Sequence, residues 1–193
     1  GSIDAGDTSS AADKFDDRSD WSLLNGTSTT AGDAALGWTL PTMVEGMTVY
    51  VSHAADAGEG DKHTGVGVQY NAGPITVAYA KNDEEAAESN LTYAGASATF
   101  QGLTVTLESM QDEAGGTSAK IDEDVIGVKY GMGDVTLFAT SYEKKVAGTL
   151  TSDVSAYGLH YDLGGGVTFF VEASQDDKND AADATGAGIE MAF

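Results

Sequence analysis

The chain has 193 residues and a formal net charge of −22, with 31 acidic against 9 basic side chains. This acidic excess excludes nucleic acid as a ready partner, because the phosphates would be repelled. The absence of cysteine excludes disulfides and thiolate metal sites, and no apolar run is long enough for a membrane-spanning helix. The 25 glycines, two prolines and scarcity of helix-periodic stretches instead predict an all-β fold.

The first 30 residues, "GSIDAGDTSSAADKFDDRSDWSLLNGTSTT", show no strand period. They are acidic and rich in Ser, Thr and Gly, a composition typical of loops. We therefore expect residues 1–30 to form a loop that precedes the first strand.

Turn signals and strand-like runs alternate along the rest of the chain. Each run is about as long as a tilted strand needs to cross a bilayer. The sequence predicts eleven strands, at residues 31–40, 46–54, 62–71, 74–81, 90–100, 103–111, 123–131, 134–143, 153–162, 167–175 and 186–193.

The connections between these runs are of two alternating kinds. Short turns such as "NAG", "QG", "GMG" and "DLGGG" contain residues that tolerate positive φ and are typical of hairpins. Longer and mostly acidic pieces, among them "NDEEAAES", "DEAGGTSAKID", "EKKVAGTLTS" and "DDKNDAADAT", lie at the other end. We expect a sheet with one short-turn edge and one long-loop edge.

A hairpin repeat of about 30 residues runs through the chain. The strands that run toward the short-turn edge end at Leu40, Tyr70, Phe100, Tyr130, Tyr161 and Phe193, with gaps of 30, 30, 30, 31 and 32 residues. Aromatic rings at one height suit a boundary between membrane and water, where an amphipathic ring reaches both media. A soluble barrel with an aromatic rim is the alternative, although it leaves the asymmetry of the turns unexplained.

Alternation along each strand separates a bulky face from a polar face. Val66, Val68 and Tyr70 are typical of the bulky face, whereas small or polar residues occupy the other positions. The alternation itself fits a soluble fold with the bulky face inside or a membrane barrel with it outside. Eleven strands without covering helices favour the membrane barrel, whose water-filled lumen would be lined by Glu108, Lys129, His160, Glu172 and Glu190.

No catalytic or metal-binding constellation is evident. His53, His63 and His160 fall on separate predicted elements, and no serine has the G-x-S-x-G context of a nucleophile. The stretch "DDKNDAADATG" lacks the alternating ligands of an EF-hand. We expect no enzyme and no cofactor, with at most weak Ca²⁺ binding at the acidic loops.

The C-terminal stretch "YDLGGGVTFFVEASQDDKNDAADATGAGIEMAF", Tyr161 to Phe193, resembles the last two strands of alphaproteobacterial general porins of the Rhodobacter type. Its ending, with Gly188, Met191 and Phe193, resembles the signal by which the outer-membrane assembly machinery recognises a barrel's last strand. Phe193 therefore has two compatible interpretations, as a ring of the aromatic girdle and as part of the assembly signal.

The resemblance implies a transmembrane antiparallel β-barrel in the outer membrane of a Gram-negative bacterium. These porins have sixteen strands and a long loop folded into the lumen after the fifth, so five strands would be missing. Residues 1–30 would be the remnant of that constriction loop and residues 31–193 the C-terminal eleven strands. Carboxylates and one base would then line the narrowest part of the pore, namely Asp16, Asp17, Arg18 and Asp20.

The implied function is passive diffusion of small hydrophilic solutes and ions through a water-filled channel with a preference for cations. The implied partners are two further copies in a homotrimer, lipopolysaccharide with outer-membrane lipid, and the barrel assembly machinery. The alternatives are a secreted acidic β-rich surface protein or adhesin, which would bury its bulky face and dissolve without detergent, and a narrow specific channel or structural barrel.

Overall fold

The computed structural model describes residues 1–16, 33–54, 63–84, 89–113, 119–179 and 183–192. They form twelve antiparallel strands in a single sheet, in which the strand order equals the chain order. The strands are β1 (Ser2–Ser9), β2 (Asp33–Thr39), β3 (Met47–Ala54), β4 (His63–Ala72), β5 (Ile75–Glu84), β6 (Ser89–Phe100), β7 (Leu103–Glu113), β8 (Ile121–Met132), β9 (Val135–Val146), β10 (Thr149–Gly164), β11 (Val167–Asp176) and β12 (Ala184–Met191).

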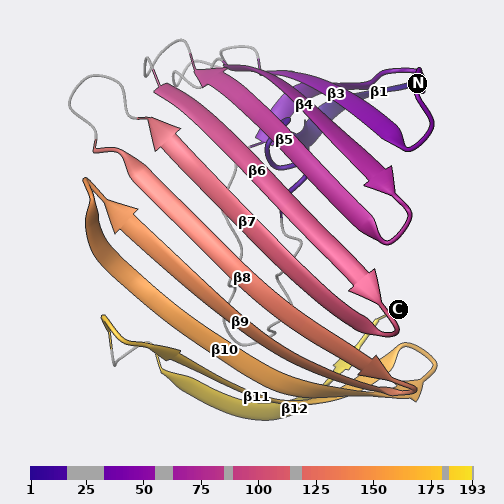
Figure 1. Ribbon diagram of the computed structural model, residues 1–193, viewed down its shortest axis with the longest axis vertical. Helices are drawn as coiled ribbons and strands as arrows, with labels where there is room; N and C mark the ends of the chain where they lie inside the picture. Colours follow the sequence, from indigo (N-terminus) through magenta and orange to yellow (C-terminus); the bar gives the residue numbers. More distant parts are fainter. Residues whose placement is uncertain (17–32, 55–62, 85–88, 114–118, 180–182, 193) are drawn as a thin grey trace.

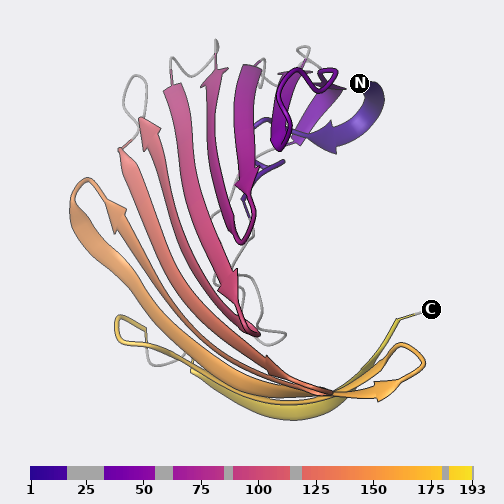
Figure 2. The same ribbon diagram turned by 45° about the vertical axis from the view of Figure 1, so that its right-hand side comes forward.

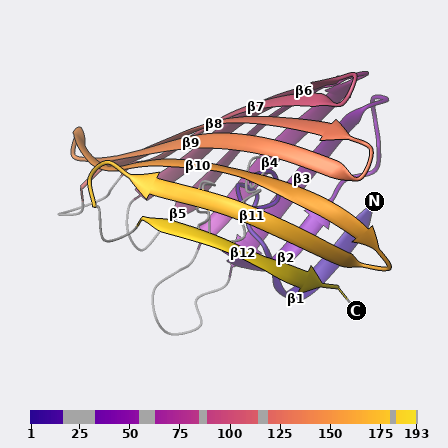
Figure 3. The same cartoon turned by 90° about the horizontal axis from the view of Figure 1, so that it is seen from below.

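The sheet is strongly curved and forms a trough with one concave and one convex face (Figures 1 and 2). Seen from below, β1 and β12 lie at the two ends of the strand order (Figure 3), and no pairing joins them in the described sheet. The described residues include no helix long and apolar enough to cross a bilayer. The predicted all-β architecture with sequentially paired antiparallel strands is thus confirmed.

The expected loop at residues 1–30 is wrong at its beginning, because Ser2–Ser9 form β1 and raise the number of strands from eleven to twelve. β1 pairs with β2 in a register that places Ile3 opposite Trp38 and Ala5 opposite Leu36, and a bulge follows Ala5. Ile3 is the single large apolar residue in "SIDAGDTS". The strand therefore lacks the hydrophobic alternation on which sequence analysis depends, and its backbone ladder with β2 defines it instead.

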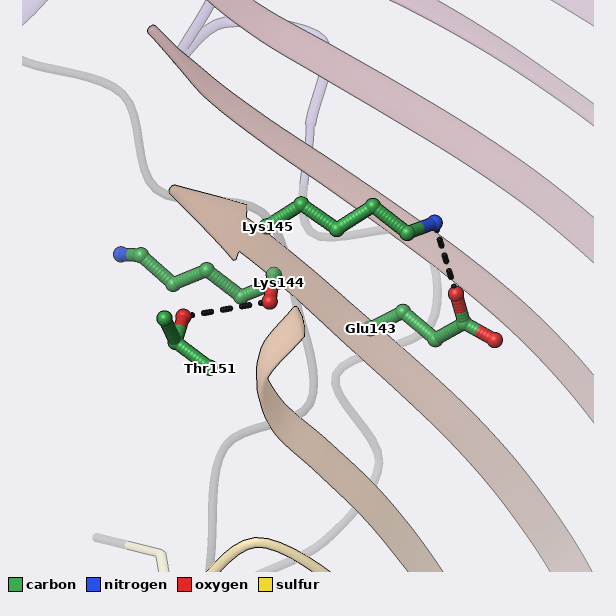
Figure 4. Close-up of polar contacts among 4 residues, drawn as sticks. All are labelled: Glu143, Lys144, Lys145 and Thr151. Carbon is green, nitrogen blue, oxygen red and sulfur yellow. Dashed lines mark hydrogen bonds and ion pairs between the residues drawn. The ribbon is translucent and has the colours of Figure 1, made fainter. Parts of the chain in front are cut away.

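The connection between β9 and β10 is also shorter than expected from "EKKVAGTLTS". Ala147 and Gly148 have φ angles of 50° and 76°, the pattern of a two-residue hairpin turn of type I′. A bulge follows at Thr151, whose hydroxyl donates to the Lys144 carbonyl oxygen at 3.1 Å (Figure 4). This long-loop edge therefore carries one tight hairpin among its longer connections.

The bulky face is the convex face of the trough. Val66, Leu107 and Ile126 each expose about half of their surface, at 54%, 51% and 55%. An apolar sheet face left open in this way requires an apolar solvent, which is what the lipid interpretation predicts and the adhesin alternative does not. The belt includes Leu36, Trp38, Val68, Tyr70, Val77, Tyr79, Val105, Val128, Tyr130, Leu137, Tyr157, Tyr161, Phe169, Val171, Ile189 and Met191.

The aromatic residues of the repeat lie at the short-turn edge of this belt. Tyr70 pairs with Val77 across the β4–β5 hairpin, Tyr130 with Leu137 across β8–β9, and Tyr161 with Phe169 across β10–β11. Phe100, the member of the repeat on β6, precedes a tight turn at Gln101 and Gly102, where both φ angles are positive. The predicted girdle is confirmed for these residues, whereas Phe193 lies outside the described residues.

Candidate functional site

A segment at residues 10–16 leaves β1 and folds onto the concave face. It is a tight turn held by its own backbone, in which Lys14 N–H donates to the Ser10 carbonyl at 2.9 Å and Phe15 N–H to the Ala12 carbonyl at 3.0 Å. The Ser10 hydroxyl accepts the Asp13 N–H at 3.2 Å, as in a capped helical turn. We call residues 10–16 the inward segment.

Two buried hydrogen bonds attach the inward segment to the wall of the trough. The Asn82 side-chain amide on β5 donates to the Ser10 hydroxyl at 2.9 Å, and the Ala11 N–H donates to the Ser52 hydroxyl on β3 at 2.9 Å. Ser10 and Ala11 are completely buried. Because polar groups without partners would be costly there, these bonds fix the position of the segment on the wall.

Glycines in the wall make room for the inward segment. A Cβ on Gly67 of β4 would lie 2.5 Å from Phe15 Cε2, and a Cβ on Gly65 would lie 2.8 Å from Ala11 Cβ. Phe15 packs in one buried cluster with Ala78, Ala80 and Tyr93. Glycine and alanine at these positions thus let a chain segment lie flat against the sheet.

Tyr50 on β3 supports the beginning of the inward segment. Its hydroxyl donates to the Ser9 carbonyl at 3.0 Å, and its ring lies 5.4 Å from the Lys14 ammonium, within the range of a cation–π contact. Tyr50 is completely buried, and its hydroxyl would collide with any Cβ on Gly37. The segment is therefore held by β2, β3, β4 and β5 together.

Of the predicted constriction residues, Asp16 is described and Asp17, Arg18 and Asp20 lie outside the described residues. Asp16 ends the inward segment, and its N–H donates to the Ala12 carbonyl at 3.2 Å. It is half-buried over the concave face. The structure thus shows that the chain turns into the trough at residues 10–16, just before Asp17, Arg18 and Asp20 in the sequence.

The predicted wall residues Glu108, Lys129, His160, Glu172 and Glu190 all belong to the strand faces that point into the trough. Glu108 is buried and accepts the Tyr93 hydroxyl at 2.9 Å. His160 Nε2 and Glu172 Oε1 are 2.5 Å apart, and Glu172 is 2% exposed. The structure therefore brings His160 and Glu172 together, whereas Glu108 has a separate partner on β6.

Aromatic side chains on the concave face were missed by the sequence analysis. Phe138 meets the His160 ring edge-on with centroids 5.1 Å apart, and Phe170 lies 6.5 Å from the same ring. A Cβ on Gly158 would lie 2.7 Å from Phe138, and one on Gly188 would lie 2.8 Å from Phe170. Alternation between glycine and a large ring on neighbouring strands was the signal that could have identified them.

Glu123 is a second omission on the polar face. It is 2% exposed, and Lys144 Nζ lies 2.8 Å from its Oε1. The two residues are directly opposite each other in the register of β8 and β9. Glu123 has the same parity as Lys129 on β8, so following the polar alternation toward the start of that strand would have located this pair. This pair places a carboxylate and an ammonium group in contact on the wall.

Charged pairs also follow the long-loop edge on the convex side. Lys145 Nζ contacts Glu143 Oε2 at 2.9 Å, and Figure 4 shows Lys144 and Lys145 pointing to opposite sides of β9. Lys120, which precedes β8, contacts Asp122 at 2.9 Å, and this hydrogen bond raises the pKa of Lys120. Such exposed pairs contribute little to stability and mark where the apolar belt ends.

The described residues include no group of His, Asp or Glu suited to hold a metal ion. The weak Ca²⁺ binding expected at acidic loops stays a prediction, because the loop residues 55–62, 114–118 and 180–182 lie outside the described residues. Of the expected assembly signal, Gly188 packs against Phe170 and Met191 is 58% exposed on the convex side, whereas Phe193 lies outside the described residues.

Solved porin structures share this architecture. A triple mutant of Rhodobacter blastica porin matches with a TM-score of 0.72 and 18% identity over 99% of this chain and 73% of its own. A porin refined at 1.8 Å resolution matches with a TM-score of 0.80 and 18% identity, over 99% of this chain and 77% of its own. At this identity the likeness shows a common fold.

No curated protein matches the chain in a sequence comparison. The family model described as Gram-negative porin, however, matches residues 1–181, which is most of the chain. Together with the open apolar belt, the aromatic girdle and the inward segment, this match identifies the chain as a member of the Gram-negative porin family, whose place is the outer membrane and whose function is that of a channel.

Proposed function

We propose that the protein is a general diffusion channel with a preference for cations, in which the inward segment and the residues that follow it form the constriction. The observation that carries this proposal is the docking of residues 10–16 on the concave wall through Ser10, Ala11 and Phe15. A segment held by buried contacts narrows the lumen permanently, so it sets an upper size for solutes without a moving part.

The cation preference follows from the charges near this constriction. Asp13 and Asp16 belong to the inward segment, with Lys14 as its one base, and Asp17 and Asp20 follow with Arg18. Carboxylates where the lumen is tightest attract cations and repel anions over roughly 10 Å, the Debye length at 0.1 M salt. The preference should therefore weaken as salt concentration rises.

The charges on the concave wall also favour cations over anions. Glu108, Glu123 and Glu172 are each buried on the concave face with a partner, and Glu190 is exposed there. Lys129 and Lys144 are the bases of this face in the described strands, and Lys144 is already paired with Glu123. Net negative charge thus remains on the wall, and no bond is made or broken as a solute passes.

Three partners belong to this proposal. The exposed apolar belt calls for lipid around the barrel, with lipopolysaccharide at the long-loop edge where charged residues replace apolar ones. Two further copies would complete a homotrimer. The barrel assembly machinery would act on the last strand, through Gly188, Met191 and Phe193.

The test is the reversal potential of the assembled porin in a planar bilayer under a KCl gradient at low salt. We expect cation preference in the wild type and a clear shift toward zero when Asp16 and Asp17 are both replaced by Asn. Asp83→Asn removes a carboxylate from the outer edge, where Lys81 pairs with it at 2.8 Å, and should leave the potential unchanged. Anion preference in the wild type, or equal potentials in the wild type and the double variant, would refute the proposal.

A further inference from the structure

Two cavities lie side by side on the concave wall near the short-turn edge, away from the inward segment. One has a volume of about 340 Å³ and the other of about 400 Å³. Thr136 and His160 line both of them, so these two residues form the partition between the cavities. The two cavities differ sharply in charge.

The first cavity contains a base and no carboxylate. Lys129 on β8 lies in its lining opposite Phe138 of β9, and Gly102 and Gly131 leave the space beside them open. It thus offers an ammonium group, a hydroxyl from Thr136 and the face or edge of an aromatic ring. This combination suits a carboxylate that is attached to a small organic chain.

The second cavity contains three carboxylates and no Lys or Arg. They come from Asp134 in the β8–β9 turn, Asp162 on β10 and Glu190 on β12, and all three residues are exposed. Asp162 Oδ1 accepts the Gly164 N–H at 2.7 Å and so also holds the β10–β11 turn. Glu190, on β12, is the carboxylate of this cavity that lies farthest from Lys129 in the strand order.

The partition between the cavities is held in place. His160 lies opposite Thr136 in the register, its Nε2 is 2.5 Å from the buried Glu172, and its ring meets Phe138 edge-on. A side chain fixed on two sides keeps the two cavities at a constant separation. Preorganisation of this kind lowers the cost of binding a solute that spans them.

We propose that this pair of cavities is a dipolar subsite for short zwitterionic peptides, with the peptide carboxylate toward Lys129 and its ammonium toward Glu190. Four strand spacings and four residues along the strand separate the Cα atoms of Lys129 and Glu190, about 23 Å in all. An extended peptide adds about 3.4 Å per residue. Once the reach of the Lys129 and Glu190 side chains is subtracted, about three to four peptide residues span the remaining distance.

The subsite rests on the proposed channel function, because a solute must enter the lumen to reach it. It goes beyond general diffusion in that it binds one class of solute in a saturable manner. A zwitterion also suits a lumen whose net charge is negative, since its ammonium end is attracted while its carboxylate end finds Lys129.

The experiment compares tetraglycine with two analogues blocked at one end, N-acetyl-tetraglycine and tetraglycinamide. Partial blockade of single-channel KCl current in planar bilayers gives an apparent affinity for each probe. Lys129→Gln should weaken tetraglycine and N-acetyl-tetraglycine about two- to fivefold, the range for one partly exposed ion pair, and leave tetraglycinamide unchanged. Glu190→Gln should weaken tetraglycine and tetraglycinamide and leave N-acetyl-tetraglycine unchanged.

Comparing each variant with the wild type for the same probe cancels the general preference of the pore for cations. Lys129→Arg should retain the wild-type affinities, and Lys145→Gln, at the outer edge, should also leave them unaltered. Open-channel conductance of each variant reports that the barrel has folded. Equal apparent affinities for tetraglycine and both blocked analogues would overturn the subsite, and so would an equal effect of Lys129→Gln and Lys145→Gln. A protein that conducts no KCl would instead refute the channel itself.

Discussion

Phe15 of the inward segment occupies the space that any side chain on Gly67 of β4 would need, because a Cβ at that position would lie 2.5 Å from Phe15 Cε2. Gly67 pairs with Tyr50 on one side and Ala80 on the other, and both are buried around the same ring. One glycine on the wall therefore decides whether the segment can lie flat.

The first prediction follows from this contact. Gly67→Ala should loosen the inward segment and destabilise the folded porin by about 1–3 kcal/mol, the usual cost of overpacking. Single-channel recordings should show increased current noise, because the constriction is no longer fixed. Gly131→Ala is the matched control, since its Cβ would meet only the Gly102 carbonyl oxygen, at 4.0 Å. Equal noise in the two variants would argue against the docking.

The second prediction concerns the pair of His160 and Glu172. Replacing His160 by Leu removes the contact between His160 Nε2 and the buried Glu172 carboxylate and should cost about 1–3 kcal/mol, measured by urea unfolding in lipid vesicles. The double replacement of His160 and Glu172 by Leu should be less destabilising than the sum of the two single replacements, since it removes both partners of the contact together. Strictly additive effects of the two single substitutions would contradict a direct interaction.

The third prediction tests which face meets lipid. Val128 lies opposite Val105, the neighbour of Thr104 in the chain, with Val128 on the convex face and Thr104 on the concave one. Val128→Lys should destabilise the barrel by about 1–2 kcal/mol, because Val128 lies on the lipid face close to the girdle residue Tyr130, whereas Thr104→Lys should be nearly neutral. Refolding into vesicles measures both. A larger cost for Thr104→Lys would invert the assignment of the two faces.

The fourth prediction concerns the last residue. Phe193→Asp should reduce the amount of folded porin in outer membranes, because the terminal strand loses both an aromatic anchor and part of its assembly signal. Heat-modifiable migration of extracted membranes provides the measurement. Phe193→Tyr keeps an aromatic ring at the boundary and should retain most of the folded protein. Unchanged yield in the Asp variant would exclude the signal.

Most strands were predictable because apolar residues alternate with small or polar residues along each of them. Val66, Val68 and Tyr70 alternate with Gly65, Gly67 and Gln69, so the period of two survives in the sequence. β1 was not predictable in this way, because its neighbour β2 and a bulge at Gly6 define it. The formation of β1 depends on its pairing with β2, which the sequence of β1 does not indicate.

The candidate site was predictable in its type and only partly in its detail. Sequence alternation placed Glu108, His160 and Glu172 on the lumen face, but it treated that face as uniformly polar and so passed over Tyr50 and Phe138. A ring on the inner wall is signalled by a glycine on the adjacent strand, a relation that requires the register. The hydrogen bond between Asn82 and Ser10 depends on the curvature of the trough, which no local sequence pattern indicates.

The bond between Asn82 and Ser10 joins positions 72 residues apart, whereas every ladder of the sheet joins strands that are neighbours along the chain. Hairpins can therefore form one after another, but residues 10–16 can dock on the concave face only after β3, β4 and β5 have paired. At that stage the sheet is still an open trough that a chain segment can enter from the side. Closure would leave the ends of the barrel as the entrances, so we expect the constriction to form during biogenesis rather than after it. Substitutions at this contact should consequently lower the yield of assembled protein as well as disturb its conductance.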